Sequence, residues 1–199
     1  MSSALSRSAV WIVLAVPLAV LTYDYVWEAE FLFGEVYYGG YVHDTGRIAA
    51  WLLLAALAVT PLRLTFPGSG LVRWFARQRR YLGVASFGYA AAHLAAYLAR
   101  QDWDVVRADL VQAGFWTGWI AFVLFAALAL TSNDLSLRLL RRGWKRLHNL
   151  VHVAAVLTFA HWALTAFDPF LAYCHIAGLL LLEGWRLFKT RRSGRAAAA

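Results

Sequence analysis

Six apolar runs, each of about 16 to 20 residues, constrain the fold of this chain more than any other feature. A helix that crosses a bilayer needs about 20 such residues, and in lipid the helix is the form that satisfies every backbone hydrogen bond within one segment. Only 15% of the residues are charged, whereas a soluble domain carries about 25%. We therefore predict an all-α integral membrane protein, a six-transmembrane-helix bundle. The expected spans are 8–23, 46–64, 81–99, 115–130, 147–167 and 170–188.

The basic residues predict the orientation of this bundle. If both ends of the chain and the two basic connectors lie on one side, that side holds all but three of the 19 Lys and Arg residues, the exceptions being Arg47, Arg100 and Arg107. The positive-inside rule then places both termini in the cytoplasm and an acidic loop, Asp24 to Asp44, outside. The same distribution accounts for the net charge of +8 without nucleic acid. We expect residues 1–188 to form the membrane domain and the basic and alanine-rich tail, 189–199, to be disordered.

Histidines are the chemically informative residues within the spans. An ionisable side chain at membrane depth costs free energy, so such residues usually face the bundle interior and serve a function. On a helical rise of about 1.5 Å per residue, His93, His161 and His175 lie at one level, and His148 lies about 20 Å deeper. The single Cys174 forms no internal disulfide, and the sequence has no Cys-His cluster for zinc or an iron–sulfur cluster.

Two levels of imidazole are what a pair of stacked b-type haems would require. Neutral imidazole is a good axial ligand for haem iron, and ligation by two histidines favours electron transfer. His93 and His161 form the outer pair, whereas His148 has no histidine opposite it, and His152 is one turn away on the same face. The thirteen residues between His148 and His161 also place them about 140° apart on an ideal helix, unless His148 precedes the regular helix.

Each of these residues also has a purely structural interpretation. His93 and His161 could be polar residues that bond to a neighbouring helix, and His148 could be an interfacial base. Structural roles are the simpler interpretation for His152, His175 and the external His43. Four basic residues are either positive-inside anchors or partners of haem propionates or a flavin phosphate: Arg79, Arg80, Lys145 and Arg146.

Three blocks of the sequence resemble the MsrQ (YedZ) family of haem-binding membrane subunits, within the ferric-reductase-like transmembrane superfamily. They are TGRIAAWLLLAALAVTPLR (45–63), RRYLGVASFGYAAAHLAAY (79–97), and 131–162, which begins TSND and ends GWKRLHNLVHVAAVLTFAHW. The third block is the most specific, because a tryptophan, a Leu-His pair and a second histidine thirteen residues later occur together. Two departures from the family are His152, where tyrosine is common, and a longer, more aromatic external segment, Tyr25 to Val42.

The resemblance implies a protein of the bacterial inner membrane that contains one or two haem b groups, with His93, His148 and His161 as the iron ligands. It implies that electrons come from the quinone pool, directly or through FMN, and pass to MsrP, a periplasmic molybdopterin reductase that repairs methionine sulfoxide. Substrate chemistry would then belong to the partner rather than to this chain.

Two other functions remain compatible with the sequence. The first is a haem cytochrome without MsrP, such as a stand-alone ferric reductase or a quinol-linked oxidoreductase. The sequence has no G-x-G-x-x-G pattern for a nucleotide, so electrons would come from a separate donor, a quinol or a flavin reductase. The second is a haem-free transporter whose histidines relay protons, although the sequence shows no inverted repeat.

Overall fold

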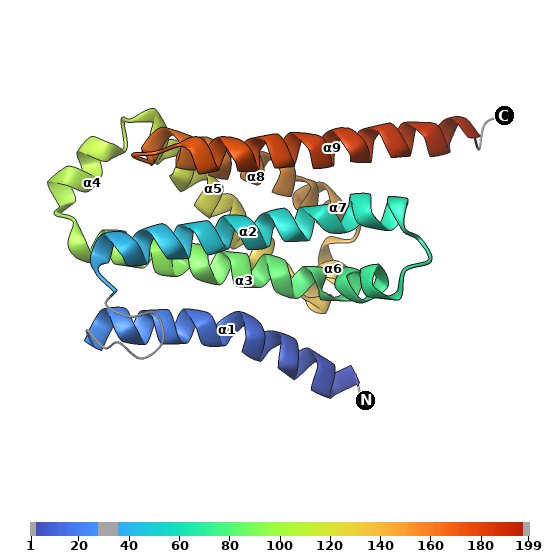
Figure 1. Cartoon of the computed structure of the whole chain (residues 1–199), viewed down its shortest axis with the longest axis horizontal. Helices are drawn as coiled ribbons and strands as arrows, with labels where there is room; N and C mark the ends of the chain where they lie inside the picture. Colours follow the sequence, from blue (N-terminus) through green and yellow to red (C-terminus); the bar gives the residue numbers. More distant parts are fainter. Residues whose placement is uncertain (1–2, 28–35, 197–199) are drawn as a thin grey trace.

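The computed structural model of this chain describes residues 3–27 and 36–196, with side chains for 8–27 and 36–191. All regular structure in these residues is helical, and six helical segments are long and apolar enough to cross a membrane. The predicted all-α bundle of six spans is therefore confirmed (Figure 1).

The six long segments are α1 (Ser3–Trp27), α2 (Tyr38–Thr65), α3 (Gly70–Arg100), α5 (Ala113–Leu130), α7 with α8 (Arg142–Asn149 and Val151–Thr165) and α9 (Phe170–Ala196). Two short helices complete the described part of the chain: α4 (Trp103–Asp109) connects α3 to α5, and α6 (Asp134–Leu140) connects α5 to α7. Side chains cap two of these helices. Ser69 accepts a hydrogen bond from the Val72 amide at the start of α3, and Asn133 accepts one from the Ser136 amide at the start of α6.

The helices extend beyond the apolar runs that mark them in the sequence. Both ends of the expected loop from Asp24 to Asp44 are helical, since Asp24 belongs to α1, where it is fully buried, and Asp44 belongs to α2. The acidic residues Glu28, Glu30 and Glu35 lie outside the described residues. At the other end, α9 continues to Ala196, so the backbone is helical over most of the segment in which we expected disorder. Helices gain these extra turns because polar residues at a membrane interface can continue a hydrogen-bonded ladder that the apolar run has already nucleated.

Helices α2, α3, α5 and α8 form the centre of the bundle. In Figure 1 α1 and α9 lie on opposite flanks of α2 and α3, and both ends of the chain lie at the same end of the bundle as α6. Helix α2 packs mainly on α3, and α5 packs mainly on α8. The largest cluster of buried apolar side chains joins α2, α5, α8 and α9, with Leu53, Phe125 and Phe159 among its members. Phe87 and Ala90 of α3, which carries His93, pack against this cluster, and α8 within it carries His161.

The fifth span is interrupted between the two histidines that the sequence could not place on one helix face. Helix α7 ends at Asn149, Leu150 is its C-cap, and α8 begins at Val151. His148 therefore precedes the regular helix that carries His161. The break removes the constraint of an ideal helix, by which the two imidazoles would point about 140° apart.

The outward-facing side chains suit a lipid environment. Large apolar residues on α1, α5, α8 and α9 are more than half exposed in the isolated chain, a surface that a soluble protein would not present. They include Ile12, Val13, Val123, Val156, Leu180 and Leu181. Polar side chains thus lie mainly in the interior of the bundle and at its two ends.

Candidate functional site

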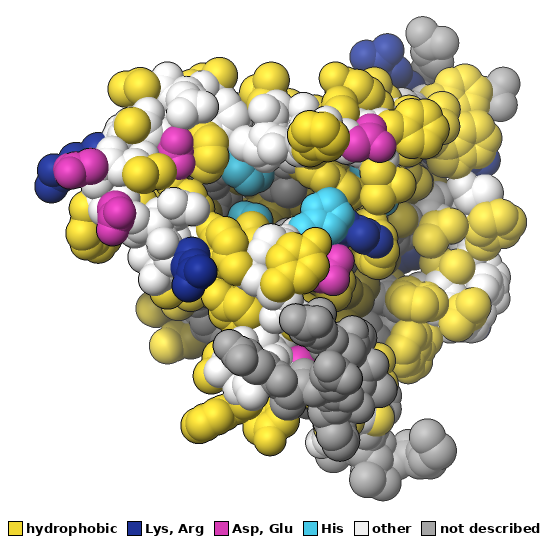
Figure 2. Space-filling model, turned by 60° about the vertical axis from the view of Figure 1, so that its left-hand side comes forward, with side chains coloured by type: hydrophobic (Ala, Val, Ile, Leu, Met, Phe, Trp, Pro, Cys, Tyr) yellow, Lys and Arg dark blue, Asp and Glu magenta, His cyan; other side chains and the backbone are white. Residues whose placement is uncertain are grey.

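Two cavities lie among the central helices, and both are lined by residues from α2, α3, α5 and the α7–α8 segment. The first, which we call the histidine cavity, has a volume of about 460 Å³ and contains both His93 and His161 in its wall. Figure 2 shows histidine side chains in the hollow on this face. The second, which we call the arginine cavity, has a volume of about 860 Å³. Phe125 lines both cavities and so lies between them.

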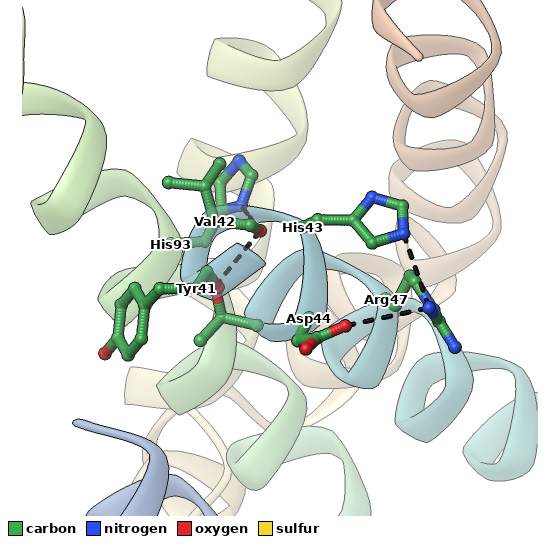
Figure 3. A network of polar contacts seen from close by, with 7 residues as sticks. Tyr41, Val42, His43, Asp44, Arg47 and His93 are labelled. Carbon is green, nitrogen blue, oxygen red and sulfur yellow. Dashed lines mark hydrogen bonds and ion pairs between the residues drawn. The ribbon is translucent and has the colours of Figure 1, made fainter. Parts of the chain in front are cut away.

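His93 of α3 is held against α2. Its Nδ1 lies 2.8 Å from the carbonyl oxygen of Val42, a contact drawn in Figure 3. A carbonyl only accepts hydrogen bonds, so Nδ1 carries the proton and donates, which leaves Nε2 with a free lone pair. The ring lies over Gly46, where a Cβ would stand 3.0 Å from Nδ1. A larger residue at position 46 would therefore push His93 out of place.

His161 of α8 is held against α5 in the same way. Its Nδ1 lies 2.7 Å from the carbonyl oxygen of Gly114, and its ring lies over Gly118, where a Cβ would stand only 2.6 Å from Nδ1. In both cases the accepting carbonyl is four residues before the glycine. The hydroxyl of the intervening threonine, Thr45 or Thr117, also donates to that carbonyl.

The two imidazoles meet across the histidine cavity. Their ring centroids are 6.2 Å apart and their planes are nearly perpendicular, at 89°. An imidazole nitrogen binds a transition metal at about 2 Å, so a metal between two imidazoles holds their ring centroids about 6 Å apart. The carbonyls of Val42 and Gly114 supply the outer hydrogen bonds that orient histidine ligands in metal sites. The donor set therefore fits a haem iron with two axial histidines.

Arg47 is the one Lys or Arg among the described residues that line the histidine cavity. Its Nη1 lies 3.3 Å from His43 Nε2 and 3.6 Å from Asp44 Oδ1, as Figure 3 shows, and its guanidinium lies 4.9 Å above the Trp51 ring. Its Nε is buried without a hydrogen-bond partner among the described residues. A buried donor of this kind fits an anionic group in the cavity, such as a haem propionate.

A polar cluster closes the same cavity near α4. The Tyr97 hydroxyl donates to Asp109 Oδ2 at 2.6 Å, and Gln101 donates to the Tyr38 hydroxyl at 3.3 Å. All four residues line the histidine cavity. This end of the cavity can therefore hold polar edges of a ligand, whereas aromatic and alanine side chains form the rest of its wall.

The arginine cavity contains His148, but not a second imidazole facing it. His148 Nε2 lies 3.1 Å from the Thr131 hydroxyl, and the ring stacks on Trp144 with centroids 3.9 Å apart. His152 also lines this cavity, and its Nδ1 lies 3.0 Å from Glu183 Oε1. The described residues that line this cavity do not form a second paired site like that of His93 and His161.

Basic residues surround the arginine cavity, although not all of the predicted ones. Arg79, Arg80 and Lys145 line it, as do three further cations, Arg77, Arg141 and Arg186, whereas Arg146 is exposed and does not. Arg79 donates to the Thr60 hydroxyl, and Arg80 pairs with Asp134 at 2.8 Å. The positive charge of this cavity suits an anionic ligand, a phosphate or a carboxylate.

His175 lies outside both cavities. Its Nδ1 donates to the carbonyl of Leu171 at 2.6 Å, and its ring packs against Trp51, Phe159 and Trp162. These contacts are those of a packed helix residue. His175 was expected at the same depth in the membrane as His93 and His161. It does not lie beside them, because α9 lies on the flank of the bundle.

The sequence analysis did not identify the residues that position the two histidines. Gly46, Gly118 and the carbonyls of Val42 and Gly114 carry no chemical signature on their own. One signal was present: a Thr-Gly dipeptide occurs at 45–46 and again at 117–118. Small residues at those points let the facing helix approach closely.

Known proteins are similar in sequence to most of this chain. Residues 45–159 match the family described as ferric reductase like transmembrane component. The chain is 37% identical over 161 residues to the protein-methionine-sulfoxide reductase heme-binding subunit MsrQ of Xanthomonas campestris pv. campestris (strain B100), which covers 78% of this chain and 72% of that protein. It is 34% identical over 157 residues to the protein of the same name from Cronobacter sakazakii, which covers 75% and 76%. No solved structure matches the chain. The chain therefore belongs to the MsrQ family, among the ferric-reductase-like transmembrane proteins.

Proposed function

We propose that this chain is a haem b electron-transfer subunit of a methionine sulfoxide reductase system. One observation carries the proposal: His93 and His161 face each other with ring centroids 6.2 Å apart, and backbone carbonyls hold both Nδ1 atoms. The relatives are named heme-binding subunits of a protein-methionine-sulfoxide reductase, which supports the same function.

The chain would contribute ligands and orientation, and the haem would supply an iron that takes up and releases single electrons. His93 and His161 would hold the haem iron, and a haem held by two histidines would favour electron transfer over oxygen binding. Their Nδ1 hydrogen bonds fix the ring tautomers and raise the basicity of Nε2. Arg47 would bind a propionate, and the apolar wall around Phe122 and Phe125 would exclude water. His148 is the candidate ligand for a second haem in the arginine cavity, with His152 as an alternate.

The direction of transfer follows from the placement of charge. Both chain ends and the two basic connectors would lie in the cytoplasm of a bacterial cell, with the chain in the inner membrane. Electrons would enter from a quinol, or through FMN bound at the arginine cavity, whose cations suit a phosphate. They would leave from the opposite end to a periplasmic MsrP-like molybdopterin reductase.

The test is the optical spectrum and haem content of purified variants. We expect wild-type protein to show a bis-imidazole b-type spectrum, and His93→Ala or His161→Ala to lose the haem held by that pair. His175→Ala is the matched control, because its side chain lines neither cavity, and it should keep the full spectrum. A lower haem content in His148→Ala than in wild type would show that a second haem binds in the arginine cavity. A folded wild-type protein without colour would exclude the proposal.

A ferric reductase or another quinol-linked cytochrome is the second candidate, because residues 45–159 match the ferric-reductase-like family as a whole. Its haem spectrum would be the same. Reduced protein that fails to pass electrons to purified MsrP, but reduces a ferric chelate, would favour this function.

A further inference from the structure

The carbonyl oxygen of Gly114 accepts hydrogen bonds from two side chains. His161 Nδ1 donates to it at 2.7 Å from α8, and the Thr117 hydroxyl donates to it at 2.7 Å from within α5. The Thr117 residue is only 6% exposed, so water does not compete for its hydroxyl. A candidate iron ligand and a buried hydroxyl therefore share one acceptor.

The hydrogen bonds of Thr117 differ from those that a helical threonine usually makes. A threonine hydroxyl inside a helix commonly donates to the carbonyl four residues earlier. Thr117 also makes this bond, to Ala113 at 2.9 Å, but its bond to the third preceding carbonyl, that of Gly114, is shorter. No other threonine in the described segments has this order of distances. The hydroxyl is thus directed to the carbonyl that holds His161.

The same three groups meet at His93, but the threonine contributes less there. The Val42 carbonyl accepts from His93 Nδ1 at 2.8 Å and from the Thr45 hydroxyl at 3.2 Å. The Thr45 hydroxyl is directed mainly to the Tyr41 carbonyl, at 2.7 Å. The two histidines therefore differ in one respect: the carbonyl that holds His161 also accepts a short threonine bond, whereas the carbonyl that holds His93 accepts a long one.

A shared acceptor changes what the imidazole offers to a metal. A carbonyl oxygen that accepts a second donor holds the first one less strongly, because both donors draw on the electron density of the same atom. An imidazole whose Nδ1–H is held less strongly is a less basic ligand at Nε2. A less basic ligand stabilises ferric iron less, so the reduction potential of the iron rises. Hydrogen bonds to axial ligands are among the means by which proteins set haem potentials.

We propose that Thr117 is a positioning residue that raises the reduction potential of a haem held by His93 and His161; this inference rests on the proposed haem function. Thr117 does not line the histidine cavity, so it acts through the Gly114 carbonyl and the His161 ring and not by contact with the ligand. Thr45 acts in the same direction, with a smaller effect. A higher potential makes a haem easier to reduce and weaker as a reductant, so the hydroxyl divides the driving force between the two transfer steps.

The experiment is a redox titration of haem absorbance in the full chain, reconstituted in lipid nanodiscs. Thr117→Val replaces the hydroxyl by a methyl group of similar size. At the potential where wild-type haem is half reduced, we expect its ratio of ferrous to ferric haem to be roughly three- to tenfold lower, and a tenfold change corresponds to about 59 mV for one electron. Thr117→Ser keeps the hydroxyl and should restore the wild-type potential.

Two further variants show whether the effect belongs to the shared carbonyl. Thr45→Val should lower the potential less than Thr117→Val does. Thr190→Val is the matched control, because its hydroxyl also contacts two carbonyls, at 2.9 and 3.0 Å, but it lines neither cavity and should keep the wild-type potential. All variants should keep the bis-imidazole spectrum, since both axial ligands remain.

Haem titration into haem-free protein gives a second readout. Thr117→Val should favour ferric over ferrous haem by the same factor that the potential shows, and Thr117→Ala, which adds no methyl group in place of the hydroxyl, should behave alike. An unchanged or raised potential in either variant would overturn the inference and leave the haem function intact. Loss of haem from both would also overturn it, because the hydroxyl would then hold the site together. A wild-type protein without haem would overturn the proposed function, and this inference with it.

Discussion

At the scale of single residues, glycine and threonine decide where the two imidazoles stand. Gly46 and Gly118 lie directly under the rings of His93 and His161, and no other residue type leaves that space. Thr45 and Thr117 donate to the same two carbonyls that accept from the rings. The two halves of the site therefore use one local arrangement twice, on α2 with α3 and on α5 with α8.

Gly118→Ala should disrupt the site from the facing helix. The added Cβ would stand 2.6 Å from His161 Nδ1, so the ring must move and its hydrogen bond to Gly114 must break. Such overpacking costs about 1 to 3 kcal/mol, and we expect loss of the haem held by the pair. Gly88→Ala is the control, since a Cβ there meets nothing within 4 Å. Thermal unfolding and haem absorbance measure both effects, and unchanged haem binding in Gly118→Ala would contradict the geometry.

Arg47→Gln should weaken haem binding without removing the axial ligands. Arg47 is the cation of the histidine cavity, and hydrogen bonds to charged groups are worth about 1.5 to 3 kcal/mol. A haem titration should therefore show affinity reduced by roughly ten-fold or more, with the bis-imidazole spectrum retained at saturation. Arg107→Gln removes a largely exposed arginine from the same end of the bundle and should bind haem like wild type. Equal affinities in the two variants would mean that Arg47 does not contact the ligand.

At the scale of elements, the break at Leu150 separates two tasks within one span. Helix α8 holds His161 against α5, while α7 holds His148 between Thr131 and Trp144. Trp144 also donates to the Thr131 carbonyl at 2.9 Å, which ties α7 to the end of α5. The orientation of His148 thus depends on α7 and not on the face of α8.

Insertion of one alanine after Leu150 should affect the two cavities differently. The extra residue turns α7 by about 100° relative to α8 and removes His148 and Trp144 together from Thr131 of α5. We expect the spectrum of the His93–His161 haem to remain and any second haem in the arginine cavity to be lost. An alanine inserted at Val111, between α4 and α5, is the control and should preserve both. Haem content per chain distinguishes the outcomes, and loss of the first haem would show that α7 and α8 act as one unit.

At the scale of the whole molecule, the two cavities lie one after the other between the same helices, with Phe125 between them. The arginine cavity is near the end that carries both chain termini and α6, and the histidine cavity is near α4. The proposed electron transfer across a membrane needs redox groups at two depths, and the two cavities lie at two depths. In the orientation predicted from Lys and Arg, the arginine cavity is the one nearer the cytoplasm.

Cysteine labelling tests that orientation. In a Cys174→Ser background, Gly68→Cys places a thiol in the turn between α2 and α3, where a side chain meets nothing within 4 Å, and Val111→Cys places one at the opposite end, where Val111 is 84% exposed. We expect a membrane-impermeant maleimide to label position 111 in intact spheroplasts and position 68 only after lysis. The reverse pattern would place both termini outside the cytoplasm.

Some features of this protein follow from the sequence by itself. Six apolar runs determine an all-α bundle, because lipid offers no partner to an unpaired backbone group. Depth along each helix also follows from residue number, because every residue adds the same rise, and this places His93 level with both His161 and His175. The basic connectors likewise predict an orientation that depends on charge and not on packing.

Other features were decided only by the tertiary structure, because they depend on which helix faces which. His175 has the same depth as His93 and His161, yet α9 packs on the flank and its ring contacts Trp162 instead of the pair. The sequence shows only that His152 is one turn from His148, and it is the packing of α9 that brings Glu183 within 3.0 Å of it. The space that Gly46 and Gly118 leave for the two imidazole rings exists only where α2 packs on α3 and α5 packs on α8. The rotation of each helix about its axis and the identity of its neighbours are set by side-chain packing between helices. The order of residues in the sequence constrains this packing only weakly.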